Sequence, residues 1–253
     1  MRHLDWSQTS QIVVLLTEDH GKVRGLAKGA KRTSPSAVAR YCGGIELLTR
    51  GQIVGTTKPT TELATLTEWD LQDSYFHLRS DLRAQQLAMY GCDIANALLG
   101  DHDPHPKVFT ALAALLSALA DRSQHETALL RYQWLLLDEG GYRPQLDRDV
   151  RSGEPLADRP TYTFDARSGG IIETSVQGTA DSAAGPWRVR RATVEILRAV
   201  GDGRFDGAAG SVVVRRANRL MCVYLRAILD RPLATMSFVL DEPEDLSGGR
   251  LGT

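Results

Sequence analysis

Residues 21–32, GKVRGLAKGAKR, carry five cations and no carboxylate in twelve positions. Arg40 follows them, and the next acidic residue along the chain is Glu46. Clustered ammonium and guanidinium groups neutralise successive phosphates of a nucleic acid, and the affinity falls as salt rises. A solvated strand and loop is the alternative interpretation of the same charges. The cations of the stretch are Lys22, Arg24, Lys28, Lys31 and Arg32.

The positions of these cations follow from the two-residue period of a strand. Lys22 and Arg24 would share one face of a strand, and Lys28 and Lys31 would lie in the loop after it with Arg32. Tyr41 is the one nearby aromatic side chain that could stack on a base, although an aromatic at such a place is more often part of the core. The glycine spacing lacks the GK[ST] ending of a phosphate-binding loop, so a nucleotide triphosphate site is not predicted.

Other polar residues offer only weak signals for catalysis. The HDPH stretch, with His102, Asp103 and His105, is typical of a polar turn, and no third ligand cluster accompanies it as a metal site would need. A metal-dependent hydrolase using His102 and Asp103 is the enzyme hypothesis, and we do not favour it. Asp138 and Glu139 are adjacent and would not face each other on a helix. The sequence therefore predicts a protein that is not an enzyme and uses no metal or other cofactor.

The charge of the whole chain is nearly balanced, with a formal net charge of -1 over 253 residues. Much of the acid lies in two stretches, 62–73 and 241–245. A balanced total makes the local basic stretch more informative, because acid elsewhere compensates it. A second basic cluster occupies 188–198, with an arginine pair at 215–216. Solvated helix faces are the main interpretation of this cluster, and a minor role in holding DNA is the alternative.

The three cysteines, Cys42, Cys92 and Cys222, form no CxxC pair. This usage indicates a reducing compartment and predicts neither a disulfide framework nor a zinc site. The first residues, MRHLDWSQTS, have no apolar signal core, and no run of about 18 apolar residues occurs. We therefore expect a cytoplasmic protein without a membrane segment.

The spacing of apolar residues changes along the chain. The first seventy residues read as short strands with tight turns, which is typical of a small barrel or sandwich. Helical periodicity begins at about residue 81, and Ser80 is the expected N-cap. Residues 141–185 are loop-like. The expected strands are 11–17, 22–29, 44–50, 52–57, 62–69, 161–164 and 170–175, and the expected helices are 81–99, 106–121, 125–139, 189–199 and 211–230.

The order of several motifs resembles the RecO family of bacterial recombination mediators. The stretch WSQTSQIVVLLTEDHGKVRGLAKGAKR is similar to the opening pattern of that family. YGCDIANALL (90–99) is similar to its first long helix, and LLRYQWLLLDEGGYRPQLDRD (129–149) to its GYxPxL segment. The glycine pair at 169–170 and RPLATMSFV (231–239) match later landmarks. The resemblance covers nearly the whole chain.

The resemblance implies an α+β protein with an N-terminal OB-fold β-barrel, followed by a mainly α-helical domain that carries a small irregular β insert. The barrel, a DNA-binding domain, would occupy 1–75, with its first strand shortened. The helical domain would occupy 76–140 and 186–240, with the insert at 141–185. Residues 241–253 would form an acidic flexible tail.

The resemblance also implies a function in DNA repair and homologous recombination. Such proteins bind single- and double-stranded DNA, anneal complementary strands, and help RecA load on coated single strands with RecR and often RecF. Their helical body commonly receives the C-terminal tail of the single-stranded-DNA-binding protein, and we expect a nucleoid-associated location. A docking scaffold that grips acidic partner peptides is the alternative. The DNA contacts implied are Lys22, Arg24, Lys28, Lys31, Arg32 and Arg40.

Two departures from the family pattern matter. Many relatives carry two CxxC pairs after the GYxPxL segment, and here Asp149 and Ser152 stand at the first pair and Glu173 and Val176 at the second. Without thiolates a tetrahedral zinc site is not expected, so the insert would be held by packing alone or be loose. The family also usually has a strand before the DWSQTS-like turn, and here only MRHL precedes it. The barrel would then lack most of its first strand, or the start codon would be placed late.

Overall fold

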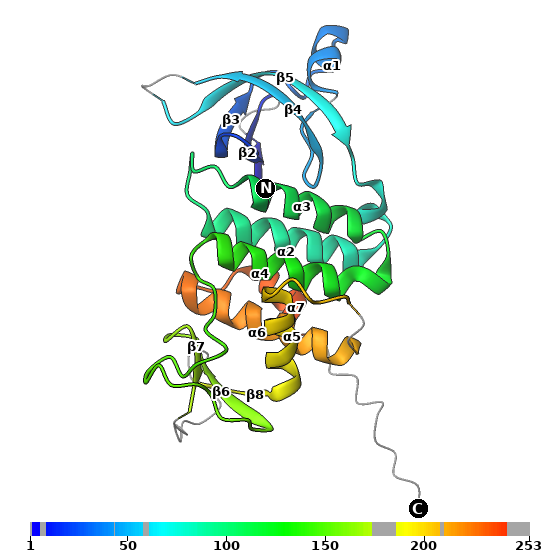
Figure 1. Cartoon of the computed structure of the whole chain (residues 1–253). Coiled ribbons are helices and arrows are strands. Elements are labelled where there is room, and N and C mark those ends of the chain that lie inside the picture. The colour runs from blue at the N-terminus through cyan, green and yellow to red at the C-terminus, as the bar shows by residue number, and fades with distance from the viewer. Residues whose placement is uncertain are drawn as a thin grey trace, which may run out of the picture. The chain divides into compact units, whose positions relative to one another are not determined.

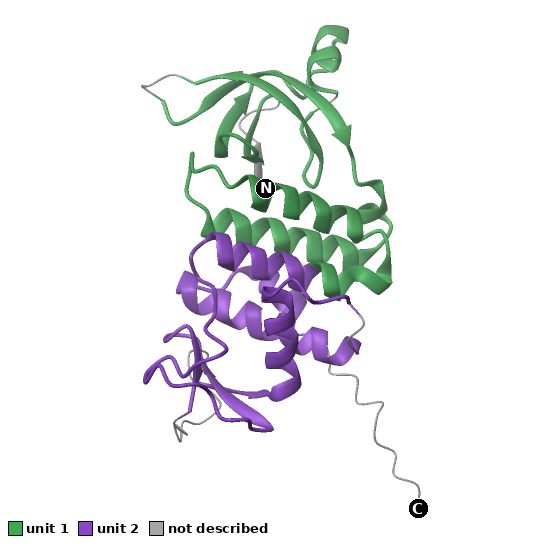
Figure 2. Ribbon diagram, viewed as in Figure 1, with its two compact units in different colours: residues 1–128 green, residues 129–253 purple. Residues whose placement is uncertain are grey.

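The computed structural model describes residues 2–5, 9–42, 44–57, 61–173, 186–207 and 210–241. The chain divides into two compact units, Met1–Ala128 and Leu129–Thr253, which are coloured separately in Figure 2. The family-based domain boundaries at 75, 140, 185 and 240 stay a prediction. Among the described residues, no helix combines enough length with enough hydrophobicity to cross a bilayer.

Unit 1 contains a five-stranded sheet and the first helices (Figure 1). The strands follow the order β1-β2-β3-β5-β4, and every neighbouring pair is antiparallel except β3 and β5. Among the described ladders none joins β4 to β1, so the sheet is open where the sequence predicted a barrel. Its elements are β1 Arg2–Asp5, β2 Gln11–Thr17, β3 Gly21–Ala27, α1 Pro35–Tyr41, β4 Arg50–Thr56, β5 Ala64–Asp73, η1 Phe76–Arg79, α2 Leu82–Leu98, α3 Pro106–Ala118 and η2 Arg122–Gln124.

The predicted α+β class is confirmed, with a β-rich N-terminal part followed by helices and a small β insert. The sheet buries a compact apolar cluster that includes Val13, Ala27, Leu66 and Trp69. Strand β2 has the predicted bounds, because its β-branched residues are framed by polar turns on both sides. The short helix α1 was not predicted. Its signal is Pro35 in the first helical turn, where the missing N–H costs nothing.

The predicted strand at 44–50 is wrong: only Arg50 of that range belongs to a strand. The backbone of Ile45 instead meets a side chain, because its N–H donates to Gln11 Oε1 at 3.0 Å. Its carbonyl accepts from Gln11 Nε2 at 3.4 Å. The buried Gln11 amide thus gives Ile45 the bonds that a neighbouring strand would give, and Leu48 turns the chain with a φ of 58°.

Helices α2 and α3 begin where their capping chemistry allows. Asp81, and not the predicted Ser80, is the N-cap of α2, and its carboxylate accepts from the N–H of Ala84 at 3.1 Å. Ser80 Oγ donates instead to the carbonyl of His77. The helical periodicity predicted from about residue 81 is confirmed, since Leu87, Tyr90 and Ile94, at helical spacing, are fully buried.

Unit 2 holds the remaining helices and a second sheet of order β7-β6-β8. Helix α4 begins in the last residues of unit 1 and has the predicted bounds. In the core of unit 2 the buried Gln133 amide donates to Asn218 Oδ1 at 2.8 Å, which joins α4 to α6. The elements are α4 His125–Glu139, β6 Thr161–Asp165, β7 Gly170–Ile172, β8 Trp187–Arg190, α5 Arg191–Gly201, α6 Ser211–Leu229, η3 Ala234–Met236 and α7 Ser237–Leu240.

Candidate nucleic-acid interface

Lys22, the first predicted DNA contact, is turned inward. Its side chain is 10% exposed, and Nζ donates to the backbone carbonyls of Asn96 and Leu99 at 2.8 Å each. The same ammonium lies 3.1 Å from Asp101 Oδ1. Three acceptors satisfy all three ammonium protons, and the positive charge lies at the C-terminal end of α2, where the helix dipole favours it. Lys22 therefore belongs to the fold of unit 1, and we remove it from the proposed interface.

Arg24 shares this face of β3, as the two-residue period predicted. Its Nη2 lies 3.2 Å from Asp101 Oδ2, so one carboxylate serves both cations. The loop after α2 also approaches β3 closely, since the N–H of His102 donates to the carbonyl of Lys22. Gly21 makes this approach feasible: a Cβ there would lie 2.2 Å from the carbonyl oxygen of Asp103. Arg24 is half exposed but already compensated, which weakens its case as a phosphate contact.

The turn after β3 carries the remaining cations of the stretch. Lys28 and Arg32 are exposed, and neither side chain has a hydrogen bond or ion pair to a described residue. Lys31 lies between them and is half-buried, and its backbone N–H donates to the carbonyl of Thr9 at 3.1 Å. The carbonyl of Gly29 accepts from the N–H of Arg32, which closes the turn. The turn is thus fixed by backbone bonds while two of its charges face solvent.

Arg40 is exposed near the end of α1. Its Nε donates to the carbonyl of Ser36 at 3.2 Å, and its guanidinium lies 6.0 Å from the ring centroid of Tyr41. Tyr41 itself is buried, and its hydroxyl donates to the carbonyl of Leu66 at 2.7 Å. Burial raises the pKa of this hydroxyl. The hypothesis that Tyr41 stacks on a base is therefore wrong, and the core alternative is confirmed.

Four of the six predicted DNA contacts stay in the candidate interface, which we call the basic turn. It consists of Lys28, Lys31, Arg32 and Arg40. Sequence reasoning missed the acceptors of Lys22, because the nearest of them lies 74 positions further along the chain. No local pattern distinguishes a lysine that reaches phosphate from one that reaches a distant helix end.

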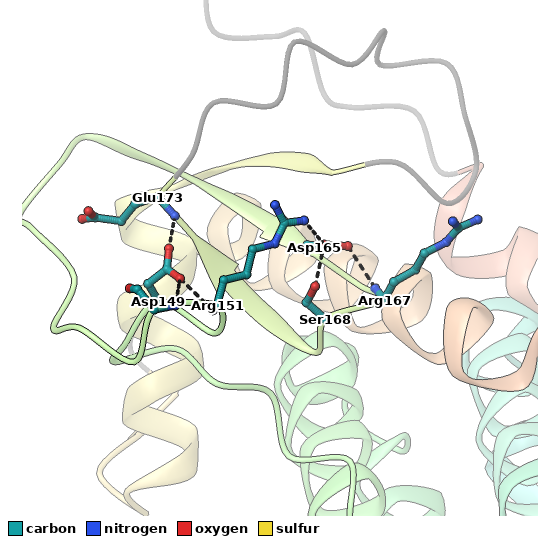
Figure 3. A network of polar contacts seen from close by, with 7 residues as sticks. Asp149, Arg151, Asp165, Arg167, Ser168 and Glu173 are labelled. Carbon is teal, nitrogen blue, oxygen red and sulfur yellow. Dashed lines mark hydrogen bonds and ion pairs between the residues drawn. The ribbon is translucent and has the colours of Figure 1, made fainter.

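The insert is organised around a buried carboxylate (Figure 3). Asp149 Oδ1 accepts from the N–H groups of Arg151 and Ser152 at 2.7 and 2.8 Å, and Oδ2 accepts from the N–H of Glu173. The N–H groups of Glu173 and Ser152 hold the pKa of Asp149 below its usual range. Three of the four positions that match the family's CxxC pairs, Asp149, Ser152 and Glu173, thus lie together, since the N–H groups of the last two donate to the Asp149 carboxylate. The fourth, Val176, lies outside the described residues.

A second buried carboxylate, Asp165, lies at the end of β6 (Figure 3). Ser168 Oγ donates to it at 2.7 Å, the N–H of Arg167 at 3.1 Å and the Arg151 guanidinium at 3.0 Å. Burial alone would raise the pKa of Asp165, but these hydrogen bonds lower it. Arg151 therefore connects the two centres through its backbone and its side chain. Hydrogen bonds as well as apolar contacts hold the insert, which the sequence analysis did not foresee.

Metal-binding geometry is lacking in the described part of the chain, where no three His, Cys, Asp or Glu side chains converge. His105 Nε2 lies 3.1 Å from Asp103 Oδ2, and His102 adopts a left-handed turn conformation with a φ of 60°. The HDPH stretch is therefore a turn in which His105 pairs with Asp103. Its backbone at Asp103 also packs closely against Gly21.

Comparison with known proteins agrees with this architecture. Residues 1–75 match the family model "Recombination protein O N terminal", and residues 79–237 match "Recombination protein O C terminal". The chain is 30% identical to the DNA repair protein RecO of Anaeromyxobacter dehalogenans (strain 2CP-C), over 98% of this chain and 96% of that protein. It is 30% identical to the RecO of Geobacter metallireducens, over 93% and 92% of the two chains. The chain therefore belongs to the RecO family of recombination and DNA repair proteins.

Proposed function

We propose that the chain is a recombination mediator that binds single- and double-stranded DNA through the basic turn. One observation carries the proposal: the turn after β3 presents Lys28 and Arg32 to solvent without a described partner. Phosphate contacts of this kind hold a nucleic acid with little preference for sequence. The protein would act in the cytoplasm, at the nucleoid.

Annealing follows from the same physics. Two complementary strands repel each other through their phosphates, and cations placed between them screen this repulsion. Access to a coated strand also requires contact with the coating protein, so we propose the C-terminal tail of the single-stranded-DNA-binding protein and RecR as partners. RecA, and RecF in some systems, would act on the strand that this complex delivers. No step in this account makes or breaks a covalent bond, so the function needs no cofactor.

Neutralising the basic turn should weaken DNA binding in a salt-dependent way. Each cation that contacts a single strand contributes about 0.7 to the slope of log affinity against log salt. We expect Lys28→Gln with Arg32→Gln to reduce the magnitude of the slope by about 1.4, measured by fluorescence anisotropy with a labelled oligonucleotide. The fold should be unaffected, because both side chains are exposed.

Arg231→Glu provides the matched control for this double variant. It changes the net charge by the same amount, at an exposed residue in the turn after α6. An equal loss of slope in both variants would mean that total charge and not the basic turn determines binding. An unchanged slope in the double variant would remove the basic turn from the proposal.

The docking-scaffold alternative has its own observation. Phe76 and Leu82 are 70% exposed each, which is the highest value among the large apolar side chains of the described residues. Arg79 stacks on Phe76 at 5.8 Å, so cationic and apolar groups adjoin there. Such a surface suits a partner protein with acidic and apolar residues. DNA affinity in the absence of any partner distinguishes the two functions, since a pure scaffold would show none.

A further inference from the structure

The second sheet of unit 2 carries an unusual pair of charges. Strand β8 is an edge strand that pairs with β6, with Arg188 opposite Thr163 and Arg190 opposite Thr161. The intervening Val189 is buried, so the two arginines project from the opposite, exposed side of the strand. Alternate residues of a strand lie about 6.6–6.8 Å apart, so the bases of the two side chains are close neighbours.

Nearby arginines of the same module have carboxylate partners. Arg191 contacts both Asp158 and Glu195 at 2.6 Å, and these acids raise its pKa further. Arg151 contacts Asp165 at 3.0 Å, as described above, and Arg159 lies 4.0 Å from Glu173. These four described acids, Asp158, Asp165, Glu173 and Glu195, are thus already engaged by cations other than Arg188 and Arg190.

Arg188 and Arg190 differ from these neighbours. Among the described residues, neither side chain has a hydrogen bond or an ion pair. Arg167, in the turn between β6 and β7, is also exposed, and its side chain likewise lacks a described partner. The turn follows the end of β6 that pairs with the start of β8. Within the part of the chain that the structure describes, the edge of this sheet therefore carries positive charge without a paired acid.

We propose that Arg188 and Arg190 form a second surface for the phosphates of a nucleic acid, which we call the β8 surface. The inference rests on the proposed function and extends it to unit 2. Guanidinium groups bind phosphate oxygens in a bidentate manner, and the hydroxyls of Thr161 and Thr163 beside them are further phosphate ligands. No lysine follows Lys107 in the sequence, so the cationic side chains of unit 2 are all arginines.

The surface around β8 favours a nucleic acid over a protein as its partner, because its described residues include no strongly exposed apolar anchor. Protein interfaces are centred on buried aromatic and aliphatic anchors, whereas phosphate contacts need only cations and hydrogen-bond donors. Among the described residues, no strongly exposed large apolar side chain lies between 143 and 211. The β8 surface is therefore polar and basic, and it fits a DNA backbone better than a peptide.

A second surface gives annealing a simple physical basis. A protein that holds one strand on the basic turn and another on the β8 surface raises the local concentration of each strand near its complement. Loss of either surface would then slow annealing more than it weakens binding of one short strand. This difference is what an experiment can measure.

The test compares Arg188→Gln with Arg190→Gln in the full-length protein with the charge-matched Arg231→Glu control. Single-strand binding is measured by anisotropy across salt, and annealing by fluorescence quenching of two complementary labelled oligonucleotides. We expect the double variant to lose about 1.4 of salt slope with an oligonucleotide long enough to reach both surfaces. We also expect annealing to slow by about tenfold or more, with little change in the control.

The possible outcomes separate this inference from the proposed function. If the wild-type chain binds no DNA at low salt, the proposed function fails and the β8 surface with it. If the wild-type chain binds and anneals, and the double variant matches it in slope and rate, only the β8 surface is refuted. A loss of the same size in the Arg231→Glu control would also refute it, since total charge would then explain the effect.

Discussion

Replacing Lys22 with methionine is expected to lower the free energy of unfolding by about 3 kcal/mol, since it removes a buried ammonium whose three protons are all hydrogen-bonded. Methionine keeps an unbranched apolar stem of nearly the same length. It leaves the carbonyls of Asn96 and Leu99 without the ammonium that donates to them at 2.8 Å. Chemical denaturation followed by circular dichroism gives the change directly.

Two control variants make this prediction specific. Arg24→Gln removes the other cation from Asp101, but that pair is half exposed, so we expect a loss of at most about 1 kcal/mol. Lys28→Gln should leave stability unchanged and weaken DNA binding. Lys22→Met should lower stability and leave DNA binding by the folded protein unchanged, including its salt slope. A Lys22→Met protein of wild-type stability, or one with a reduced salt slope, would mean that Lys22 faces solvent and DNA.

The second large effect is expected in the insert, where Asp149→Asn should release residues 149–173. An amide cannot accept from three N–H groups as a carboxylate does, and its own NH₂ group would face the N–H of Arg151, Ser152 or Glu173. Amide hydrogen exchange of Ser152 and Glu173 should accelerate by about tenfold or more. Glu154→Gln is the matched control, because Glu154 is exposed and also loses one charge.

The same carboxylate makes the insert sensitive to acid. The pKa of Asp149 is lowered in the folded chain, whereas in the unfolded chain it lies at about 3.9. The carboxylate therefore contributes its full stabilisation above about pH 4, and this contribution is lost as the pH falls through the folded pKa. Beyond the pH dependence of intrinsic exchange, the exchange of Ser152 and Glu173 should rise below about pH 4 in the wild type. The rise should be smaller in Asp149→Asn, where Asp165 still titrates with a lowered pKa.

A chelator should have no effect on the insert, because hydrogen bonds to a carboxylate hold it together. We expect the same exchange rates for Ser152 and Glu173 with and without EDTA at neutral pH. An insert that opens on chelation would show that a metal ion, and not Asp149, organises this segment. An Asp149→Asn variant with wild-type exchange rates would contradict the account equally.

Much of the fold follows from local sequence pattern. Strand β2 and helix α4 have the predicted bounds, since each is a clear apolar repeat between strong turn signals. The open sheet and the loop at Ile45 were not predictable in this way. Both depend on contacts between residues far apart in the sequence. The loop at Ile45, for example, is held by the Gln11 side chain, 34 positions away.

The candidate site shows the same division. The sequence locates the cations of the stretch, because charge is visible residue by residue. It does not show that Lys22 reaches the end of α2 or that Arg24 meets Asp101. The absence of cysteines in the insert was visible in the sequence. The carboxylate centre at Asp149 was not, since all three of its donors are backbone N–H groups, which almost any residue type can supply.

The most direct test of the mediator account is anisotropy of a labelled single-stranded oligonucleotide titrated with the full-length chain across a range of salt. The basic turn alone predicts a log–log slope of about -3, and the β8 surface brings it to about -4. Binding that weakens this steeply would support phosphate contact by these cations, and Lys28→Gln with Arg32→Gln would then reduce the slope. An absence of binding at low salt, or a slope near zero, would contradict the account and favour a partner-docking scaffold.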